Sequence, residues 1–343
     1  MSDTSSVSPK EQLMAAIGPE VAKIDEAMRR DLQRASTGCD PLLSEILEYG
    51  LFNGGKRLRP LLVLLAARLS GFSEESGDTG ALYKLAIAFE YLHAATLFHD
   101  DVIDRADMRR GKASVVKEYG EIAAILGGDF LHSRSMYLIG SLGGAAALEI
   151  FCRATNGMVD GEFLQLRNAE NHNLSEDDYF SAVHGKTSLL IGATCEIGAL
   201  AGGANQEEQR ALAAYGMGLG TSFQIIDDLL DYQGESGSTG KAVGNDFQEG
   251  KMTLPLILAL GRANPEERTR LLFLLKDEKA REGGFSEAYG FIEKNEGFVL
   301  SRKRAEAITA EALAGLDIFS QSAGASVVAT LRILAEYVLV RKK

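Results

Sequence analysis

The sequence contains few of the residues that mark disulfide-linked or thiolate-bound proteins. Cys39, Cys152 and Cys195 are its only three cysteines, and their spacing does not match a metal-binding pair. An odd number of widely separated cysteines does not form a disulfide framework or a thiolate zinc site. We therefore expect reduced thiols, as in a cytoplasmic protein.

Long apolar segments and an excess of positive charge are also missing. The polar stretch over 1–9 has no apolar signal core, which argues against secretion. No stretch supplies the about 20 uninterrupted apolar residues that a transmembrane helix needs. Lys and Arg number 36 against 48 Asp and Glu, and the net charge of -12 argues against nucleic acid as a partner.

Alternation of apolar and polar residues, the pattern of a half-buried strand, is missing too, whereas apolar residues recur at helical spacing. We therefore predict an all-α fold. Although 343 residues would allow two domains, no linker composition is found, and we expect 1–343 to form a single large helical domain. A helix that begins at Pro9 is predicted to break at 18–19, and one over 121–140 to be interrupted at 127–128.

An acidic cluster lies at the end of a helix predicted over 81–104. Residues three, four and seven apart share a helix face, so Asp100 and Asp104 fall on one side, with Asp101 beside them. Like charges on one face repel each other, and a divalent cation would offset this repulsion. Carboxylate oxygens without thiols favour Mg²⁺. The alternative is an acidic, solvated helix end.

The Asp-Asp-x-x-Asp spacing occurs a second time, at Asp227, Asp228 and Asp231, again after apolar residues. Two helices that each present such a cluster across a cavity would hold more than one Mg²⁺. Mg²⁺ held by few carboxylates keeps open positions, which substrate phosphates commonly fill. The pair of motifs therefore predicts a diphosphate substrate.

Basic residues follow the two glycines at 54–55, just before a predicted helix: Lys56, Arg57 and Arg59. Glycines allow a ligand to approach the backbone, and a helix start favours anions. The spacing is not that of a nucleotide-binding P-loop. Further cations along the chain are Arg109, Arg110, Lys186, Lys241 and Lys251. Each alone would be an ordinary surface charge, but beside two Asp motifs they predict two bound anions, one held through metal and one directly by Arg and Lys.

On its motifs the chain resembles the trans-isoprenyl diphosphate synthases, and most closely the bacterial octaprenyl and other long-chain synthases. The resemblance covers nearly the whole chain. In chain order, the motifs that carry it are Gly54-Gly-Lys-Arg-Leu-Arg-Pro60, Glu90-x-x-His93 with the first Asp motif, Arg109-Arg-Gly-Lys-Ala-Ser114, Gly128-Asp129, Gly161-Glu-x-x-Gln-Leu166, Lys186-Thr187, Phe223-Gln224 with the second Asp motif, and Gly240-Lys241 through Gly250-Lys-x-Thr-Leu-Pro255.

The resemblance implies an all-α helical bundle of the isoprenoid synthase type around a central cavity, and usually a homodimer. It also implies an Mg²⁺-dependent prenyltransferase that binds two or three of these ions. The residues expected to hold them are Asp100, Asp104 and Asp227, with Asp101, Asp228 and Asp231 in supporting roles.

The substrates implied are isopentenyl diphosphate and an allylic diphosphate. The first would bind against Lys56, Arg59, His93 and Arg110. The second would bind through the Mg²⁺ ions and Arg109, Lys186, Gln224 and Lys241, with Lys251 nearby. The resulting carbocation would be stabilised by Lys186, Thr187 and Gln224. The released diphosphate would accept the proton, and the product would pass to the membrane.

Small residues precede the first Asp motif. Thr96 lies one helical turn, roughly 6 Å, below Asp100 on the same face, with Ala95 at its flank. In short-chain relatives an aromatic residue at these positions closes the cavity. With small residues at this depth, the resemblance implies a product of about C30 to C50. Met136 and Tyr137 are the candidates for a lower floor.

Four alternatives are weighed against this interpretation. A farnesyl or geranylgeranyl diphosphate synthase would share the chemistry but make a shorter product. Class I terpene cyclases usually carry one Asp-rich motif and lack the Gly-Gly-Lys-Arg-x-Arg-Pro stretch. A di-iron bundle needs two Glu-x-x-His motifs, and only Glu90-x-x-His93 is found, in which His93 by itself would be a core histidine. A non-catalytic partner subunit typically lacks an Asp motif or the Arg pair, and this chain has both.

Overall fold

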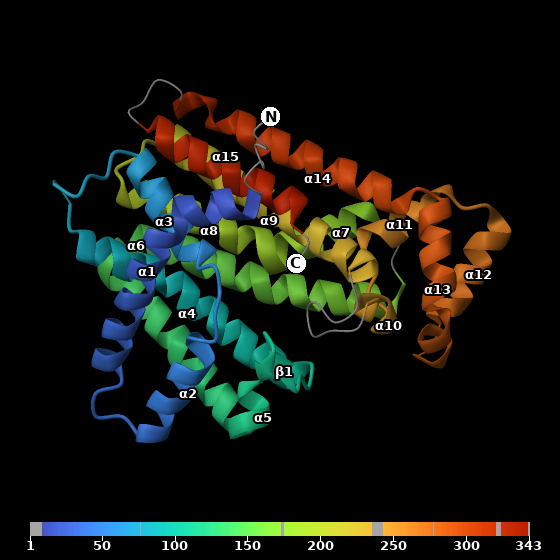
Figure 1. The fold of residues 1–343 in the computed structure, drawn as a ribbon, viewed down its shortest axis with the longest axis horizontal. Helices are drawn as coiled ribbons and strands as arrows, with labels where there is room; N and C mark the ends of the chain where they lie inside the picture. Colours follow the sequence, from blue (N-terminus) through green and yellow to red (C-terminus); the bar gives the residue numbers. More distant parts are fainter. Residues whose placement is uncertain are drawn as a thin grey trace, which may run out of the picture. The chain divides into compact units, whose positions relative to one another are not determined.

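The computed structural model describes residues 9–75, 77–172, 175–234, 243–276, 278–319 and 324–341, and helices dominate them (Figure 1). The helices are α1 (Pro9–Ala35), α2 (Pro41–Leu51), α3 (Leu58–Leu69), α4 (Thr79–Ile103), α5 (Val115–Tyr119), α6 (Glu121–Glu170), α7 (Glu176–Val183), the π-helix η1 (His184–Ser188), α8 (Leu189–Ala201), α9 (Gln206–Gln233), α10 (Asn245–Gln248), α11 (Leu254–Arg262), α12 (Pro265–Leu275), α13 (Glu278–Lys294), α14 (Gly297–Ala314), the 3-10 helix η2 (Gly315–Phe319) and α15 (Ala325–Val340). Strands β1 (Met108–Arg109) and β2 (Lys112–Ala113) form a minimal antiparallel hairpin. The predicted all-α fold is confirmed.

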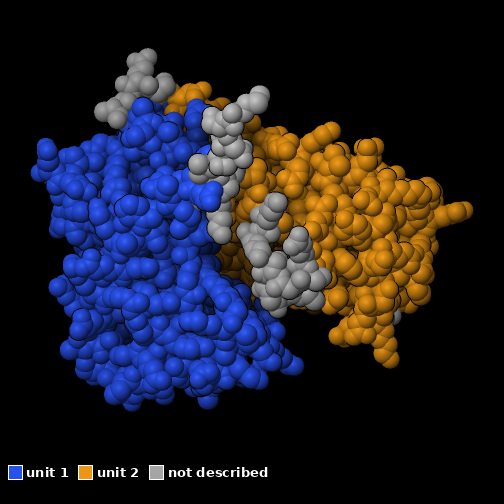
Figure 2. Space-filling model, viewed as in Figure 1, with its two compact units in different colours: residues 1–152, 193–213, 318–333 blue, residues 153–192, 214–317, 334–343 orange. Residues whose placement is uncertain are grey.

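The chain forms two compact units (Figure 2). Unit 1 comprises Met1–Cys152, Ala193–Ala213 and Ile318–Ile333. Unit 2 comprises Arg153–Gly192, Ala214–Asp317 and Leu334–Lys343. The unit boundaries fall within α6, α8, α9, η2 and α15, so both units are built from segments distant in the sequence.

In unit 1, α4 packs against α3 and α1. Helix α3 is almost wholly buried because its residues are apolar on every side. Close packing continues at the end of α8, where a Cβ on Gly198 would lie 2.4 Å from the Val63 carbonyl oxygen of α3. The first Asp motif therefore stands at the end of a helix that neighbouring helices hold in place.

Helix α1 is continuous, so the predicted break at 18–19 is wrong. Pro19 lies inside the helix, where proline normally costs about 3 kcal/mol. The apolar residues on both sides of it keep one helical stripe, and all are at most 1% exposed: Leu13, Ile17, Ile24 and Met28. Burial of this stripe outweighs the local cost of proline, since tertiary packing contributes most of the stability of a protein helix.

Helix α6 departs from helical geometry at Gly144, with φ 73°, and not at the predicted glycine pair. Gly127 and Gly128 remain helical within α6. Side chains from α4 occupy the space that a Cβ at these two positions would need. A Cβ on Gly128 would lie 2.4 Å from His99 Nε2, and one on Gly127 would lie 3.2 Å from the Phe98 ring. These glycines permit close packing of two helices.

In unit 2, α11 packs on α14, and α12 lies beside α13 (Figure 1). Helix α9 contributes one apolar face to this core through Ile225, Ile226, Leu229 and Tyr232. The second Asp motif lies on the same helix. Burial of these apolar residues, which alternate with the carboxylates along α9, therefore fixes the position of the motif.

Among the described helices, α6 alone is long and apolar enough to cross a membrane by length and composition. Polar residues interrupt this helix, so it is not the uninterrupted apolar stretch whose absence the sequence indicated. Core helices of water-soluble proteins meet the same criterion, and α6 supplies Leu131, Ile139 and Phe151 to the core of unit 1. In its most apolar window, however, only 33% of residues are buried.

Candidate active site

The first Asp motif lies in the last turn of α4. The helix begins at Asp78, whose carboxylate accepts a hydrogen bond from the Ala81 backbone N–H at 2.9 Å. Asp104 caps its other end, and Asp100 lies one turn earlier. Asp101 differs from these two because it is only 2% exposed and accepts hydrogen bonds from the Arg109 guanidinium. Asp101 is therefore bonded within the protein, and its supporting role at the metal site stays a prediction.

The β1–β2 hairpin brings Arg110, the second arginine of the motif at 109–114, to the Gly54–Gly55 segment. Its turn residues Arg110 and Gly111 have positive φ, as a tight hairpin turn requires. Arg110 donates a hydrogen bond to the Gly54 carbonyl oxygen. A Cβ on Gly55 would lie 3.0 Å from the same guanidinium. Two motifs distant in the sequence thus meet in unit 1.

Arg57 has a structural role that the sequence did not reveal. Its side chain is 3% exposed and donates to Glu90 Oε1 at 2.8 Å and to Asp25 Oδ1 at 2.7 Å. It also donates to the Leu51 carbonyl oxygen at 2.8 Å. Glu90 is therefore bound to Arg57, which argues against its predicted alternative as half of a di-iron site.

His93 lies within a group of positive charges. Burial and the nearby charge of Arg59, followed by those of the other arginines, lower the pKa of His93 well below its usual value, so the imidazole is neutral at pH 7. Burial also lowers the pKa of Arg59, with Arg110 acting in the same direction. The Nε of Arg59 is buried without a hydrogen-bond partner. These charges, with Lys56 in the same loop, make a site for an anion.

The second Asp motif in unit 2 is joined to the predicted catalytic residues. Gln224 donates to Asp228 Oδ1 at 2.9 Å, and the Thr187 hydroxyl donates to Gln224 Oε1 at 3.4 Å. The Tyr179 hydroxyl donates to Asp228 Oδ2 at 2.7 Å. The structure therefore brings Thr187 and Gln224 together, and both oxygens of Asp228 are occupied within the protein.

Lys186 lies in the π-helix η1, a geometry frequent at functional sites. Its ammonium is 2.5 Å from Glu162 Oε2 and donates to Gln165 Oε1 at 2.8 Å. Both partners belong to the Gly161-Glu-x-x-Gln-Leu166 motif on α6. The sequence pointed to this motif but assigned it no role.

Asp246 is a further carboxylate that sequence reasoning missed. Its backbone N–H donates to Asp231 Oδ2 at 3.0 Å. Burial and the charge of Asp246 raise the pKa of Asp228 to about 8 and that of Asp231 to about 7. Lys251 compensates part of this charge, since its ammonium is 3.1 Å from Asp246 Oδ1 and 2.6 Å from Glu249 Oε2. The one feature of the sequence that pointed to Asp246 is its position shortly before the Gly250-Lys251 motif.

Asp227, the outermost residue of the second motif, contacts the last described residue of the chain. Arg341 donates to Asp227 Oδ1 at 2.8 Å and to the Phe223 carbonyl oxygen at 3.0 Å. Its guanidinium lies 3.8 Å from the centroid of the Phe223 ring. A cation already interacts with this carboxylate, which side-chain spacing alone did not predict.

Among the described residues, no three His, Cys, Asp or Glu side chains form a group that could hold a metal ion. The predicted ligands are divided, with Asp100 and Asp104 in unit 1 and Asp227 in unit 2. Their donor set is entirely carboxylate, and the raised pKa values of Asp228 and Asp231 indicate negative charge that is not fully compensated. In chemistry these residues fit Mg²⁺. The predicted phosphate ligand Lys241 lies outside the described residues.

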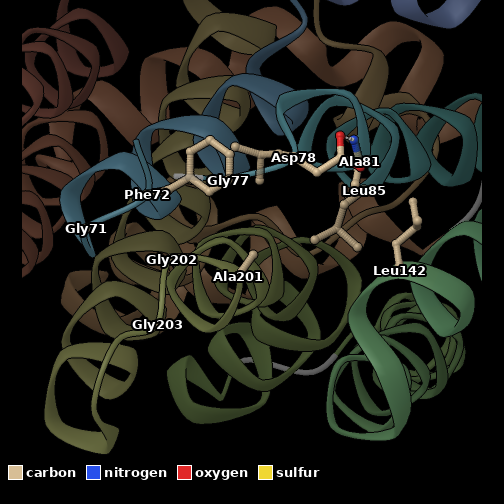
Figure 3. A pocket seen from close by; sticks show the side chains of 11 residues that line it. Gly71, Phe72, Gly77, Asp78, Ala81, Leu85, Leu142, Ala201, Gly202 and Gly203 are labelled. Atoms are coloured by element: carbon tan, nitrogen blue, oxygen red, sulfur yellow. Dashed lines mark hydrogen bonds between the residues drawn. The ribbon is translucent and has the colours of Figure 1, made fainter. Parts of the chain in front are cut away.

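An open space lies in unit 1 near the start of α4, away from the Asp motif. It has a volume of about 420 Å³. Leu85 of α4 and Leu142 of α6 line it, and Phe72 lies beside Gly77 at its other end (Figure 3). The predicted floor residues Met136 and Tyr137 are 39% and 61% exposed, so they do not close an internal cavity of this chain.

The chain is similar in sequence and in structure to known proteins. A family model for polyprenyl synthetase matches residues 40–292. The octaprenyl diphosphate synthase of Escherichia coli (strain K12) is 39% identical over 246 residues, covering 72% of this chain and 72% of that protein. The corresponding protein of Haemophilus influenzae is 32% identical over 312 residues, covering 91% of this chain and 92% of that protein. The crystal structure of a polyprenyl synthase from Caulobacter crescentus CB15, complexed with calcium and isoprenyl diphosphate, is similar with a TM-score of 0.86 and 33% identity, covering 99% of each chain.

We expect Glu90→Gln to destabilise the protein by about 3 to 5 kcal/mol, because it leaves the buried charge of Arg57 with one fewer partner. Glu48→Gln is the matched control, since the pair of Arg29 and Glu48 is more than half exposed on both sides and should contribute no more than about 1 kcal/mol. Chemical denaturation of both variants would measure the difference. Equal effects would contradict the structural role of the Arg57–Glu90 pair.

Proposed function

The chain belongs to the polyprenyl synthetase family, and on that premise we propose that it joins isopentenyl diphosphate head to tail to an allylic diphosphate. The product is a long-chain trans-polyprenyl diphosphate. The observation that carries this proposal is the group of arginines around neutral His93, on the helix that also bears Asp100 and Asp104. One helix thereby presents groups for binding an anion directly and groups for binding a cation.

We assign isopentenyl diphosphate to the positive group in unit 1, which consists of Lys56, Arg59, His93 and Arg110. The neutral imidazole donates or accepts a hydrogen bond without adding charge. The unpaired Nε of Arg59 is a buried donor, and such a donor is stabilised when a ligand oxygen accepts from it. Arg57 holds the loop in place through its ion pairs with Asp25 and Glu90.

We assign the allylic diphosphate to Arg109, Lys186, Gln224 and Lys241, with Lys251 close to the phosphates. Asp100, Asp104 and Asp227 would hold Mg²⁺, and Asp101, Asp228 and Asp231 would support them. When bound, Mg²⁺ supplies positive charge that offsets the negative charge of the departing diphosphate. The hydrogen bonds from Arg109 to Asp101 and from Gln224 to Asp228 orient these side chains before substrate binds.

In this reaction the protein positions the two substrates and stabilises the charges that develop on them. The allylic C–O bond breaks, the isopentenyl double bond attacks the resulting carbocation, and the released diphosphate accepts the proton that is lost. The hydroxyl of Thr187 and the amide oxygen of Gln224 carry partial negative charge, and their contact at 3.4 Å places two such dipoles together. We propose that these oxygens stabilise the carbocation while Lys186 binds the diphosphate.

We further propose that 1–343 works as one synthase domain. The single family match over 40–292 includes residues of both compact units, which supports this proposal. We place the enzyme in the cytoplasm and expect its apolar product to pass to a membrane.

The product is long, and we place its tail along the face of α4 below Asp100. Thr96, Phe89, Leu85 and Leu82 follow one another on this face at helical spacing. Leu82 and Leu85 line the open space near the start of the helix, and Leu85 lies roughly 22 Å from Asp100 along the helix axis. Such a path lies well below Thr96 and so argues against a floor one turn below Asp100.

We propose that the partner of the exposed apolar face of α6 is a second copy of this chain. Ile122, Leu126 and Tyr137 are 76%, 59% and 61% exposed and lie on one side of the helix at 3.6 residues per turn. Contiguous apolar side chains at a surface mark an interaction site. A two-fold dimer would bury this face against itself.

A product assay tests the proposed function. Wild-type protein, labelled isopentenyl diphosphate, farnesyl diphosphate and Mg²⁺ should give products that end at or beyond C30, and Asp100→Ala should reduce turnover at least about 100-fold through lost charge stabilisation. Products ending at C20 would identify a shorter-chain synthase. A wild-type chain that makes no product would instead indicate a partner subunit and contradict the proposal.

Substitutions along α4 test the path of the tail. Thr96→Phe and Ala95→Phe should shorten the product most, whereas Leu85→Trp should remove only the longest products because it lies deeper. Lys84→Phe is the control, since it lies on another side of α4. Chromatographic resolution of chain lengths is the measurement. If Phe at 95 and 96 leaves product length unchanged, the tail does not follow this face.

Light scattering coupled to size exclusion tests the dimer. The wild type should have twice the mass of the chain, and Leu126→Asp should shift it to monomer because a buried unpaired charge opposes association. Phe273→Asp is the matched control, since Phe273 is 56% exposed on α12 of unit 2. A monomeric wild type, or equal dissociation of both variants, would rule out this interface.

A further inference from the structure

We propose that Glu162 is a positioning residue for Lys186. Together with Gln165 it fixes the ammonium, and its negative charge weakens the hold of Lys186 on diphosphate so that diphosphate leaves after each addition. The inference rests on the proposed function, in which Lys186 binds the allylic diphosphate. It adds a role for α6, whose side chains had none in the reaction.

The packing of α6 against η1 shows why Glu162 reaches this lysine. A Cβ on Gly161 would lie 2.3 Å from the Lys186 backbone nitrogen, and one on Gly185 would lie 2.7 Å from the Gly157 carbonyl oxygen. The backbones therefore touch directly, and larger residues would separate them. Gly157, Gly161 and Gly185 thus allow the first half of η1 to pack directly against α6.

This contact places two acceptors on one ammonium. Glu162 and Gln165 are three residues apart and so share a face of α6. Glu162 Oε2 is 2.5 Å and Gln165 Oε1 is 2.8 Å from Lys186 Nζ. A lysine ammonium has three N–H donors, so a third donor remains for a ligand, in a direction that the other two determine.

Folding stability does not account for the pair. The side chains of Lys186 and Glu162 are 35% and 37% exposed, and ion pairs with this access to water contribute little to stability. Their effect on a bound anion is larger. A carboxylate beside the ammonium offsets its charge, which lowers its attraction for diphosphate while leaving its direction fixed. Since diphosphate is released at every addition to a long chain, weaker binding favours continued turnover.

Binding of inorganic pyrophosphate, measured by calorimetry in buffer containing Mg²⁺, tests the proposal. Glu162→Gln keeps a hydrogen-bond acceptor but removes the charge, and we expect it to bind pyrophosphate about fivefold more tightly at low salt, a difference that should shrink at high salt. Glu162→Asp keeps the charge and should restore the wild-type affinity. In the product assay, Glu162→Gln should show a matching drop in the inhibition constant of pyrophosphate.

Glu170→Gln is the matched control because it removes the same charge from an exposed position on α6. Equal pyrophosphate affinity of Glu162→Gln and the wild type, or an equal increase in Glu170→Gln, would overturn the proposal. Gln165→Glu gives an independent test if Glu162→Gln fails to fold, since an added carboxylate should weaken binding and an unchanged affinity would contradict the role. Absence of polyprenyl product from the wild type would overturn the proposed function instead, whereas the affinities compare the variants without product formation.

Discussion

The buried pair of Arg57 and Glu90 is the contact on which the anion-binding side of unit 1 depends. Arg57 stands just before α3 and Glu90 in the middle of α4, so their hydrogen bond joins the glycine-containing loop to the helix with the first Asp motif. A buried charge is tolerated only with partners, and Asp25 of α1 supplies the second. Helices α1, α3 and α4 are thereby fixed relative to the loop that contains Arg57. Arg59 on α3 and His93 on α4 take their positions from these helices.

A different constraint, the crowding of carboxylates, organises the chemistry of unit 2. Burial and the charge of Asp246 raise the pKa of Asp228 and that of Asp231, and Lys251 together with backbone and side-chain donors offsets part of this negative charge. The remaining negative charge suits a cation. In the same unit, the direct contact of α6 with η1 orients Lys186, whose ammonium pairs with Glu162.

Much of the fold could be predicted from local pattern. The helix that carries the first Asp motif and the place of Asp101 beside Asp100 and Asp104 follow from helical spacing, because spacing is a property of a short segment. The supporting role of Asp101 is instead an implication of the family resemblance. Predictions based on glycine and proline as helix breakers were less successful. Pro19 lies within α1 and Gly128 within α6, since burial and close packing outweigh local preference where a tertiary neighbour is present.

The sequence by itself determined the helical class, the two carboxylate motifs, the basic segments and the family resemblance, because each depends on residue type and spacing along the chain. Only the tertiary structure distinguished neighbours of the same type. Arg57 is buried in ion pairs whereas the Nε of Arg59 is unpaired, and Asp101 faces Arg109 whereas Asp100 and Asp104 are less buried. Tertiary structure likewise joined Glu162 to Lys186. The physical reason is that the function of a charge depends on its burial and its partners, and both are set by segments far away in the sequence.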